Sequence, residues 1–152
     1  GKPVKITWHH SAVESKGPTG VRNIQKGHLD RGFSDIGYHF LVDSDCRIFQ
    51  GRKFLDKKSL INGPELAIGA HSKSNNSGNI GICFMGDFSD KNLPDSMFWA
   101  GLFLTSILMG VYNIKTSELY GHRDQKATIC PGRVYDRIEV AKHLLKLGKI
   151  DD

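Results

Sequence analysis

The sequence predicts a mixed α/β fold in which one central mixed β-sheet is flanked by helices. Strand-like and helix-like hydrophobic patterns alternate along the whole chain, as is typical of domains whose helices pack on a sheet. The length of 152 residues and the hydrophobic content of 39% suit one globular core. No internal repeat or linker interrupts the sequence. We therefore expect residues 1–152 to form a single domain.

Two elements are predicted near the start of the chain. Apolar and polar side chains alternate over residues 4–8, and this period of two indicates a strand that is buried on one face. His9 then lies on the face opposite the apolar row. Apolar residues recur at helical spacing over residues 20–31 and Gly32 follows them, which predicts a short amphipathic helix that ends there.

A hairpin, a long loop and a central strand are predicted next. Residues 38–42 and 47–50 are apolar or β-prone and are joined by an Asp-Ser-Asp turn, so they predict a hairpin. Residues 56–78 are rich in Lys, Ser, Asn and Gly, which predicts a long surface loop of the kind that lines binding sites. The continuous apolar run over residues 79–85 indicates a strand buried on both faces.

The last part of the chain predicts two helices and one more strand. Residues 96–112 predict an apolar helix with Asp95 as its N-cap, and the apolar run within it, Met97 to Val111, is shorter than the ~20 residues that cross a bilayer. We therefore expect a buried helix and no membrane span. Residues 118–121 predict a short strand that leads into His122. Asp136 is expected to cap a final amphipathic helix.

The charge of the chain favours a polyanionic partner. Lys and Arg total 21 and Asp and Glu total 16, which gives a formal net charge of +5 and an isoelectric point of about 9.2. The basic residues are scattered, and no basic stripe interleaved with aromatic residues indicates a nucleic-acid surface. We therefore expect a cell-wall polymer as the partner and no nucleic acid. No charged-then-apolar leader opens the sequence, so its pattern indicates no compartment.

Histidine and cysteine supply the residues that are best suited to chemistry. The chain has seven histidines and three cysteines, and the odd cysteine count leaves at least one thiol unpaired. His9 or His10 at the end of the first strand, together with His122 and Cys130 from one late loop, offers the three ligands of a catalytic zinc site. The alternative is that Cys130 is a small buried residue and the histidines serve the core or the surface.

Six short motifs give the sequence a family resemblance. In chain order they are Trp8-His9-His10-Ser11-Ala12, Gly37-Tyr38-His39-Phe40, Gly69-Ala70-His71, Asn79-Ile80-Gly81-Ile82, Gly121-His122-Arg123-Asp124 and Cys130-Pro131-Gly132. Their order and spacing resemble those of the zinc-dependent N-acetylmuramoyl-L-alanine amidases. That family includes the amidase-type phage lysozymes and the animal peptidoglycan recognition proteins. The resemblance covers roughly residues 4 to 147.

The resemblance implies a zinc hydrolase that acts on bacterial peptidoglycan. Such an enzyme cuts the amide bond between the lactyl group of N-acetylmuramic acid and the L-alanine of the stem peptide. Matched by motif, the Zn²⁺ ligands fall on His9, His122 and Cys130. Two neutral imidazoles and one thiolate leave the site with a net charge of +1, which favours ionisation of a water bound to the metal.

The resemblance also implies two catalytic residues, Tyr38 and Thr128. The Tyr38 phenol would orient the water or donate a hydrogen bond to the developing oxyanion, although a Tyr at the start of a strand is also an ordinary packing residue. Thr128 stands where the phage enzymes carry a lysine and the animal enzymes a threonine. A hydroxyl there can form the same hydrogen bonds without bringing charge, and Lys126 is the alternative source of a cation.

The substrate contacts implied by the resemblance lie in the long loop. His71 matches a histidine of the substrate cleft, and Lys73 and Asn76 in the polar stretch after it are expected to contact the sugar or the peptide. The alternative is a solvated polar loop. His39 follows Tyr38 and on a strand faces away from it, so we expect a structural role for His39.

Three functions are compatible with these residues. The first is the zinc amidase, and the second is a non-catalytic module that binds peptidoglycan, which the presence of Cys130 disfavours. The third is a metal-free hydrolase in which Cys130 is the nucleophile and His122 its base. We expect a monomer that acts at the bacterial cell wall, from the periplasm, from outside the cell or by delivery from a phage, and the compartment itself is not indicated by the sequence.

Overall fold

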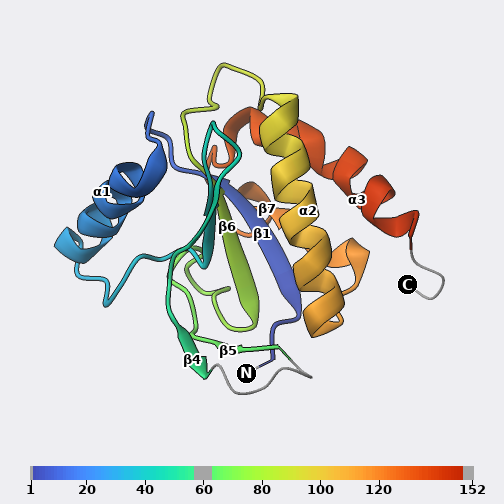
Figure 1. The fold of residues 1–152 in the computed structure, drawn as a ribbon, viewed down its shortest axis with the longest axis horizontal. Helices are drawn as coiled ribbons and strands as arrows, with labels where there is room; N and C mark the ends of the chain where they lie inside the picture. Colours follow the sequence, from blue (N-terminus) through green and yellow to red (C-terminus); the bar gives the residue numbers. More distant parts are fainter. Residues whose placement is uncertain (1, 57–62, 149–152) are drawn as a thin grey trace.

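The computed structural model describes residues 2–56 and 63–148, and a five-stranded mixed sheet lies at its centre (Figure 1). The strands and α-helices are β1 (Lys5–His10), α1 (Gly17–Asp30), β2 (Phe40–Val42), β3 (Ile48–Gln50), β4 (Phe54–Asp56), β5 (Glu65–Leu66), β6 (Asn79–Phe84), α2 (Asp95–Tyr112), β7 (Leu119–Gly121) and α3 (Ile138–Lys146). Three short 3-10 helices are η1 (Thr116–Glu118), η2 (His122–Asp124) and η3 (Gly132–Arg137). The mixed α/β class predicted from the sequence is confirmed.

The direction of the strands brings several strand ends together. The strand order is β3-β2-β6-β1-β7, with β1 parallel to both β6 and β7, β2 parallel to β6, and only β3 antiparallel. The carboxyl ends of the four parallel strands therefore meet at one edge of the sheet, where open α/β sheets place their ligands. A separate pair, β4 and β5, lies below this sheet in Figure 1.

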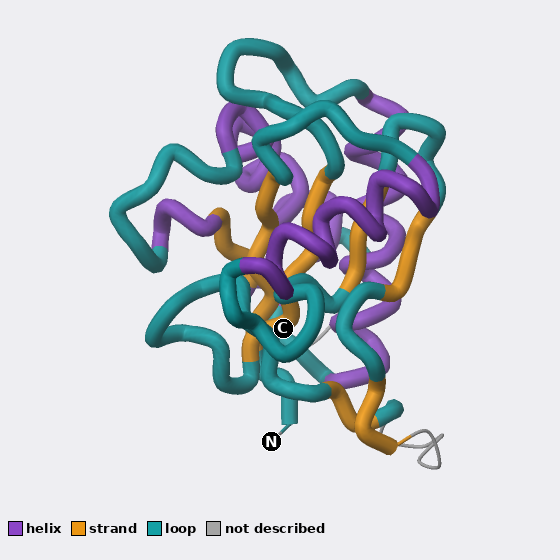
Figure 2. Tube along the Cα trace, turned by 90° about the vertical axis from the view of Figure 1, so that its left-hand side faces the viewer, coloured by secondary structure: helices purple, strands orange, loops and turns teal. Residues whose placement is uncertain are grey.

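Each face of the sheet has its own apolar core. The larger core lies under α2, where the Trp8 ring meets Phe84 edge-on and its Nε1 donates to Thr105 Oγ1 at 3.0 Å. The smaller core lies under α1 and is built around Leu41 and Met85. Figure 2 shows α1 in front of the strands and the other helices behind them. Successive side chains of a strand point to opposite faces of the sheet, so the central strands contribute apolar side chains to both cores.

Several predicted elements differ from the structure in detail. β1 is buried on both faces rather than one, because the loop that carries His71 covers the face on which His9 lies. α1 begins at Gly17, before the predicted residue 20, since Pro18 is tolerated in a first helical turn. Asp136 is not a helix cap: it lies inside η3, and α3 begins only after Arg137.

The cap of α2 and the long loop were predicted only in part. Asp95 is the first residue of α2, and Pro94 occupies the N-cap position that the sequence assigned to Asp95. The segment predicted as a surface loop, residues 56–78, contains β5 and buries both His71 and Ser72. Residues 57–62 of that prediction lie outside the described residues.

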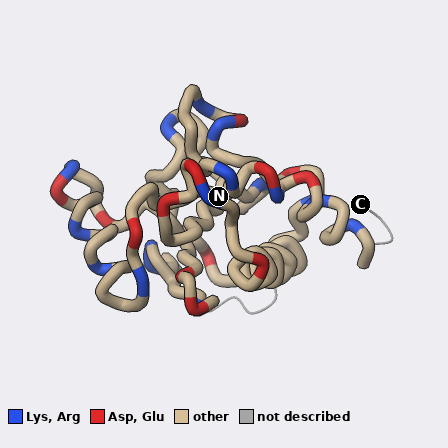
Figure 3. The backbone as a smooth tube through the Cα atoms, turned by 90° about the horizontal axis from the view of Figure 1, so that it is seen from above, with Lys and Arg blue, Asp and Glu red and all other residues tan. Residues whose placement is uncertain are grey.

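The apolar helix α2 packs against the sheet. Its 18 residues are long and apolar enough, by length and composition alone, to cross a membrane, and half of that window is buried inside the protein. Its buried residues, Met97, Leu104 and Met109 among them, contact the larger core. Lys and Arg residues are distributed along the whole backbone trace, with Asp and Glu residues between them (Figure 3).

A buried carboxylate joins α1 to the β2–β3 hairpin. Asp43 has no exposed surface and accepts hydrogen bonds from the backbone N–H groups of Gly17 and Arg47, at 3.0 and 2.9 Å. Its carboxylate also accepts from the Arg47 guanidinium, whose Nε lies at 2.9 Å. Burial raises the pKa of Asp43, but these hydrogen bonds outweigh it and hold the pKa below its ordinary value. The start of α1 is thereby fixed relative to the sheet.

We predict that Asp43→Ala lowers the free energy of unfolding by about 2–4 kcal/mol, because it leaves buried N–H donors without an acceptor. Urea denaturation followed by circular dichroism measures this. Asp45→Ala is the matched control, since Asp45 forms only half-exposed ion pairs with Lys16 and Arg47 and should cost less than about 1 kcal/mol. Equal losses in the two variants would show that Asp43 does not anchor α1.

Candidate active site

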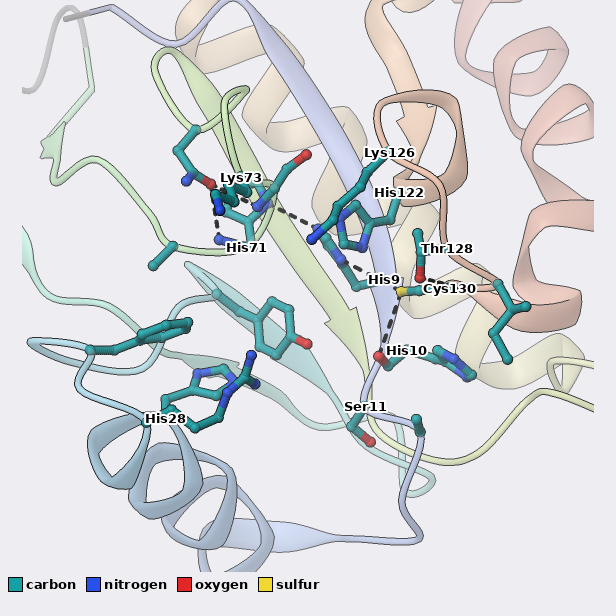
Figure 4. A pocket seen from close by; sticks show the side chains of 18 residues that line it. His9, His10, Ser11, His28, His71, Lys73, His122, Lys126, Thr128 and Cys130 are labelled. Carbon is teal, nitrogen blue, oxygen red and sulfur yellow. Dashed lines mark hydrogen bonds between the residues drawn. The ribbon is translucent and has the colours of Figure 1, made fainter.

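An open cleft of about 540 Å³ lies at the carboxyl end of β1. Its lining includes every residue that the sequence assigned to the site: His9, Tyr38, His71, Lys73, Asn76, His122, Thr128 and Cys130. The cleft lies on the α1 side of the sheet, and His28 of α1 is among its lining residues (Figure 4). The structure therefore brings together residues that lie more than a hundred positions apart in the sequence.

The parallel pairing of β1 with β7 places two of the predicted ligands side by side. Trp8 is paired with Gly121, so the residues that follow, His9 in β1 and His122 at the start of η2, project from adjacent positions with ring centroids 4.5 Å apart. Cys130 approaches from the loop after η2. The candidate donor atoms of His9, His122 and Cys130 all lie within 4.8 Å of one another. In Figure 4 the three side chains converge at one end of the cleft.

The geometry of this group fits a zinc ion. His9 Nδ1 and Cys130 Sγ are 3.7 Å apart, close to the ~3.6 Å expected between nitrogen and sulfur ligands on a tetrahedral zinc. His122 Nε2 is buried and has no hydrogen-bond partner in the described part of the chain, as expected of a nitrogen on a ring held for a ligand. His10, the alternative to His9, is engaged elsewhere, since its Nδ1 accepts the Phe88 N–H at 3.1 Å.

The protonation states of these residues also suit a metal. Burial, followed by the charges of neighbouring imidazoles, holds the pKa of His9 well below its ordinary value, and burial followed by Lys126 lowers the pKa of His122. Both rings are therefore neutral and keep a lone pair. Burial raises the pKa of the Cys130 thiol to about 11, so metal binding must displace a proton from it.

Tyr38 lies beside the ligand group as a neutral phenol. It precedes β2, is half-buried, and its ring centroid is 5.2 Å from that of His9. Burial, followed by the charges of Cys83 and Cys130, raises the pKa of Tyr38 well above its ordinary value. The phenol therefore keeps its proton at neutral pH and can act as a hydrogen-bond donor.

Thr128 and Lys126 line the opposite side of the cleft. Thr128 Oγ1 accepts the backbone N–H of Cys130 at 3.2 Å, which leaves the hydroxyl proton of Thr128 to donate to a bound group. Lys126 is exposed, and its side chain extends past His122 in Figure 4. Both residues are thus within the cleft, as the sequence predicted.

The predicted substrate contacts differ strongly in exposure. Lys73 is exposed at the rim of the cleft. The Asn76 side-chain oxygen accepts the N–H groups of His71 and Ser72, so it shapes the loop. His71 is buried and its Nδ1 lies 2.9 Å from His9 Nε2. Direct contact of these residues with a substrate stays a prediction.

Sequence reasoning missed Gln125, which ties the two loops of the cleft together. Its side-chain oxygen accepts from Ser72 Oγ and Asn79 Nδ2, and its Nε2 donates to Thr7 Oγ1. It also missed the cleft residues His28, Arg31 and Phe33. No local pattern could have singled out Gln125, since its partners come from distant segments.

Comparison with known proteins agrees with this geometry. The model of the family described as N-acetylmuramoyl-L-alanine amidase matches residues 1–133. An endolysin of Enterobacteria phage T3 is 32% identical over 126 residues, which cover 81% of this chain and 76% of the phage protein. The structure of N-acetylmuramoyl-L-alanine amidase LysC from Clostridium intestinale URNW matches with a TM-score of 0.79 and 31% identity, and the match covers 95% of this chain and 86% of LysC.

Similarity to an insect protein extends over a smaller share of that protein. A peptidoglycan-recognition protein of Drosophila simulans is 36% identical over 114 residues, which cover 74% of this chain. The same region covers 57% of the insect protein, so this chain spans little more than half of that relative.

The buried histidines predict how the stability of the metal-free protein depends on pH. Burial lowers the pKa of His9, His39 and His71, the last to about 3. Between about pH 6.5 and pH 3 the unfolded chain binds a proton at His71 that the folded chain does not bind, and His9 and His39 act in the same direction. As the pH is lowered through this window, the free energy of unfolding should therefore decrease, by about 1.4 kcal/mol per pH unit for His71 and further for the other two.

Urea denaturation of the metal-free protein at pH 7, 6 and 5 measures this slope. His39→Gln is the matched variant, because its amide nitrogen can still donate to the Ala67 carbonyl that His39 Nε2 contacts at 2.7 Å. The variant should lose stability less steeply as the pH is lowered, because one buried histidine has been removed. A stability that is constant between pH 7 and pH 5 would contradict the predicted protonation states.

Proposed function

The chain belongs to the N-acetylmuramoyl-L-alanine amidase family, and from this we propose that it hydrolyses, with a zinc ion, the amide bond between N-acetylmuramic acid and L-alanine in bacterial peptidoglycan. The observation that carries the proposal is the convergence of His9, His122 and Cys130 at the end of an open cleft. Two histidines and one cysteine are a catalytic zinc set that leaves a coordination position open.

The ligand group, Tyr38 and Thr128 each have a role in this proposal. A zinc ion held by His9, His122 and Cys130 would supply Lewis-acid chemistry, by lowering the pKa of a water and polarising the scissile carbonyl. Tyr38 donates a hydrogen bond from its neutral phenol to the oxygen on which negative charge develops. Thr128 donates from its hydroxyl while its oxygen stays bonded to the Cys130 N–H.

The charge of the cleft supports an anionic substrate. Arg31, Lys73 and Lys126 line it, and the described lining residues include no Asp or Glu. Stem peptides end in carboxylates, which such cations attract. We propose that residues 1–152 act as one catalytic domain, as a monomer, on the cell wall from the periplasmic or extracellular side or after delivery by a phage.

Two alternatives are less well supported. A non-catalytic peptidoglycan-binding module does not require a complete set of metal ligands, nor hydrogen-bond donors such as Tyr38 and Thr128 beside that set. A cysteine nucleophile requires a lowered thiol pKa, whereas burial raises the pKa of Cys130 to about 11. Moreover, the imidazole nitrogen in contact with Cys130 Sγ belongs to His9 and not to His122, the base that the nucleophile hypothesis requires.

Release of free stem peptide from purified peptidoglycan tests the proposal. We expect release by the zinc-loaded protein, loss of release with a chelator, and recovery when Zn²⁺ is added back. Cys130→Ser should bind little zinc and lose nearly all activity. Activity that is unaffected by the chelator but abolished by a thiol alkylator would establish the nucleophile mechanism instead. Binding of peptidoglycan without release would favour the binding module.

We predict that Tyr38→Phe retains zinc and lowers turnover by about 10²-fold, because one hydrogen-bond donor to the developing oxyanion is lost. Steady-state kinetics on a soluble muropeptide, together with the bound zinc per chain, measure both effects. Phe33→Leu is a control that changes a cleft aromatic residue outside the ligand group and should alter KM more than kcat. An unchanged turnover in Tyr38→Phe would remove Tyr38 from the mechanism.

A further inference from the structure

A chain of hydrogen bonds leads from the backbone of β6 through His71 to His9. His71 Nε2 lies 2.8 Å from the Asn79 carbonyl oxygen, and His71 Nδ1 lies 2.9 Å from His9 Nε2. A dashed line in Figure 4 marks the next contact in this series, between His9 and Cys130. We propose that His71 is a positioning residue that fixes the tautomer of His9, so that the Nδ1 lone pair of His9 faces the metal position. This inference rests on the proposed zinc function.

The hydrogen-bond partners determine where each proton lies. A backbone carbonyl can only accept, so His71 Nε2 carries the hydrogen. His71 is buried and has no carboxylate among its hydrogen-bond partners in the described residues, so the ring is neutral and its Nδ1 carries a lone pair. His9 Nε2 must then donate its hydrogen to His71. The remaining nitrogen, His9 Nδ1, keeps its lone pair and lies 3.7 Å from Cys130 Sγ.

Glycines hold the His71 ring in this orientation. A Cβ atom at Gly81 would lie 2.6 Å from His71 Cγ, and one at Gly69 would lie 2.6 Å from His71 Cδ2. Both contacts are too short for any side chain, so the ring packs directly on the backbone at two points. The Asn76 side chain fixes the His71 backbone as well, by accepting its N–H. The surrounding backbone therefore holds the His71 ring in one orientation, as a positioning residue requires.

The chemistry of this support is unusual for a metal ligand. Metal-bound histidines commonly donate their second N–H to a carboxylate or a backbone carbonyl. Here the acceptor is a second neutral imidazole, and the carbonyl is one step further away. The arrangement orients His9 without adding the negative charge of a carboxylate to that of the Cys130 thiolate beside the metal position.

The test measures the His9 tautomer in zinc-free protein and the zinc affinity separately. Long-range ¹H–¹⁵N correlation spectra of histidine-labelled protein should show His9 protonated at Nε2. His71→Phe keeps a ring of similar size but removes the acceptor, and should allow the other tautomer. Zinc affinity, measured by competition with a chromophoric chelator, should fall by about 10–100-fold.

Two further variants separate positioning from packing. His71→Asn places its side-chain oxygen where Nδ1 lies, so it should restore the His9 tautomer and most of the zinc affinity. His28→Phe is the matched control, because His28 Nδ1 also accepts a backbone N–H, that of Gly37, but lies outside the hydrogen-bond chain. It should change neither the His9 tautomer nor the zinc affinity.

The outcomes are distinguishable from failure of the proposed function. His9 protonated at Nδ1 in the wild-type protein would overturn the inference, and so would equal loss of zinc in His71→Phe and His71→Asn with the tautomer unchanged. A wild-type protein that binds no zinc would contradict the zinc amidase. The tautomer in the zinc-free protein would still decide whether His71 orients His9.

Discussion

The parallel pairing of β1 with β6 and with β7 is the constraint on which the site depends. Pairing with β7 sets His9 beside His122, and pairing with β6 sets the same strand beside the backbone that holds His71. The ligand group is therefore positioned by hydrogen bonds of the sheet, which are the least mobile part of such a fold. Only Cys130 arrives on a loop. A register shift of one residue in β1 would turn His9 to the other face of the sheet.

The two faces of the sheet have different roles: one carries most of the apolar core, and the other carries the cleft. The face under α2 is filled by large apolar side chains that form most of the core. The face under α1 holds a smaller core and leaves the strand ends open as the cleft. Alternation along β1 produces this division, since Ile6 and Trp8 serve one face while Thr7 and His9 serve the other. Asp43 keeps α1 at a fixed position beside the cleft.

The sequence predicted most elements, and every residue that it assigned to the site lines the cleft, because both depend on local pattern or on ordered motifs. It could not predict contacts that depend on tertiary structure. The second buried face of β1 comes from a loop some sixty positions away, which carries His71. The sequence left His9 and His10 as alternatives for the metal, and the structure distinguishes them by the Phe88 N–H that His10 accepts. Asp136 fits a capping pattern, yet the chain already turns as a 3-10 helix before that point.

The bonds made by Gln125 have a mechanical consequence. One side chain joins Ser72 on one wall of the cleft, Asn79 at the start of β6, and Thr7 in β1, while its own backbone belongs to the loop between His122 and Cys130. The two walls therefore cannot shift independently without breaking bonds beneath the cleft. A displacement of one wall would therefore displace the other as well, so the two walls are expected to move as one rigid unit.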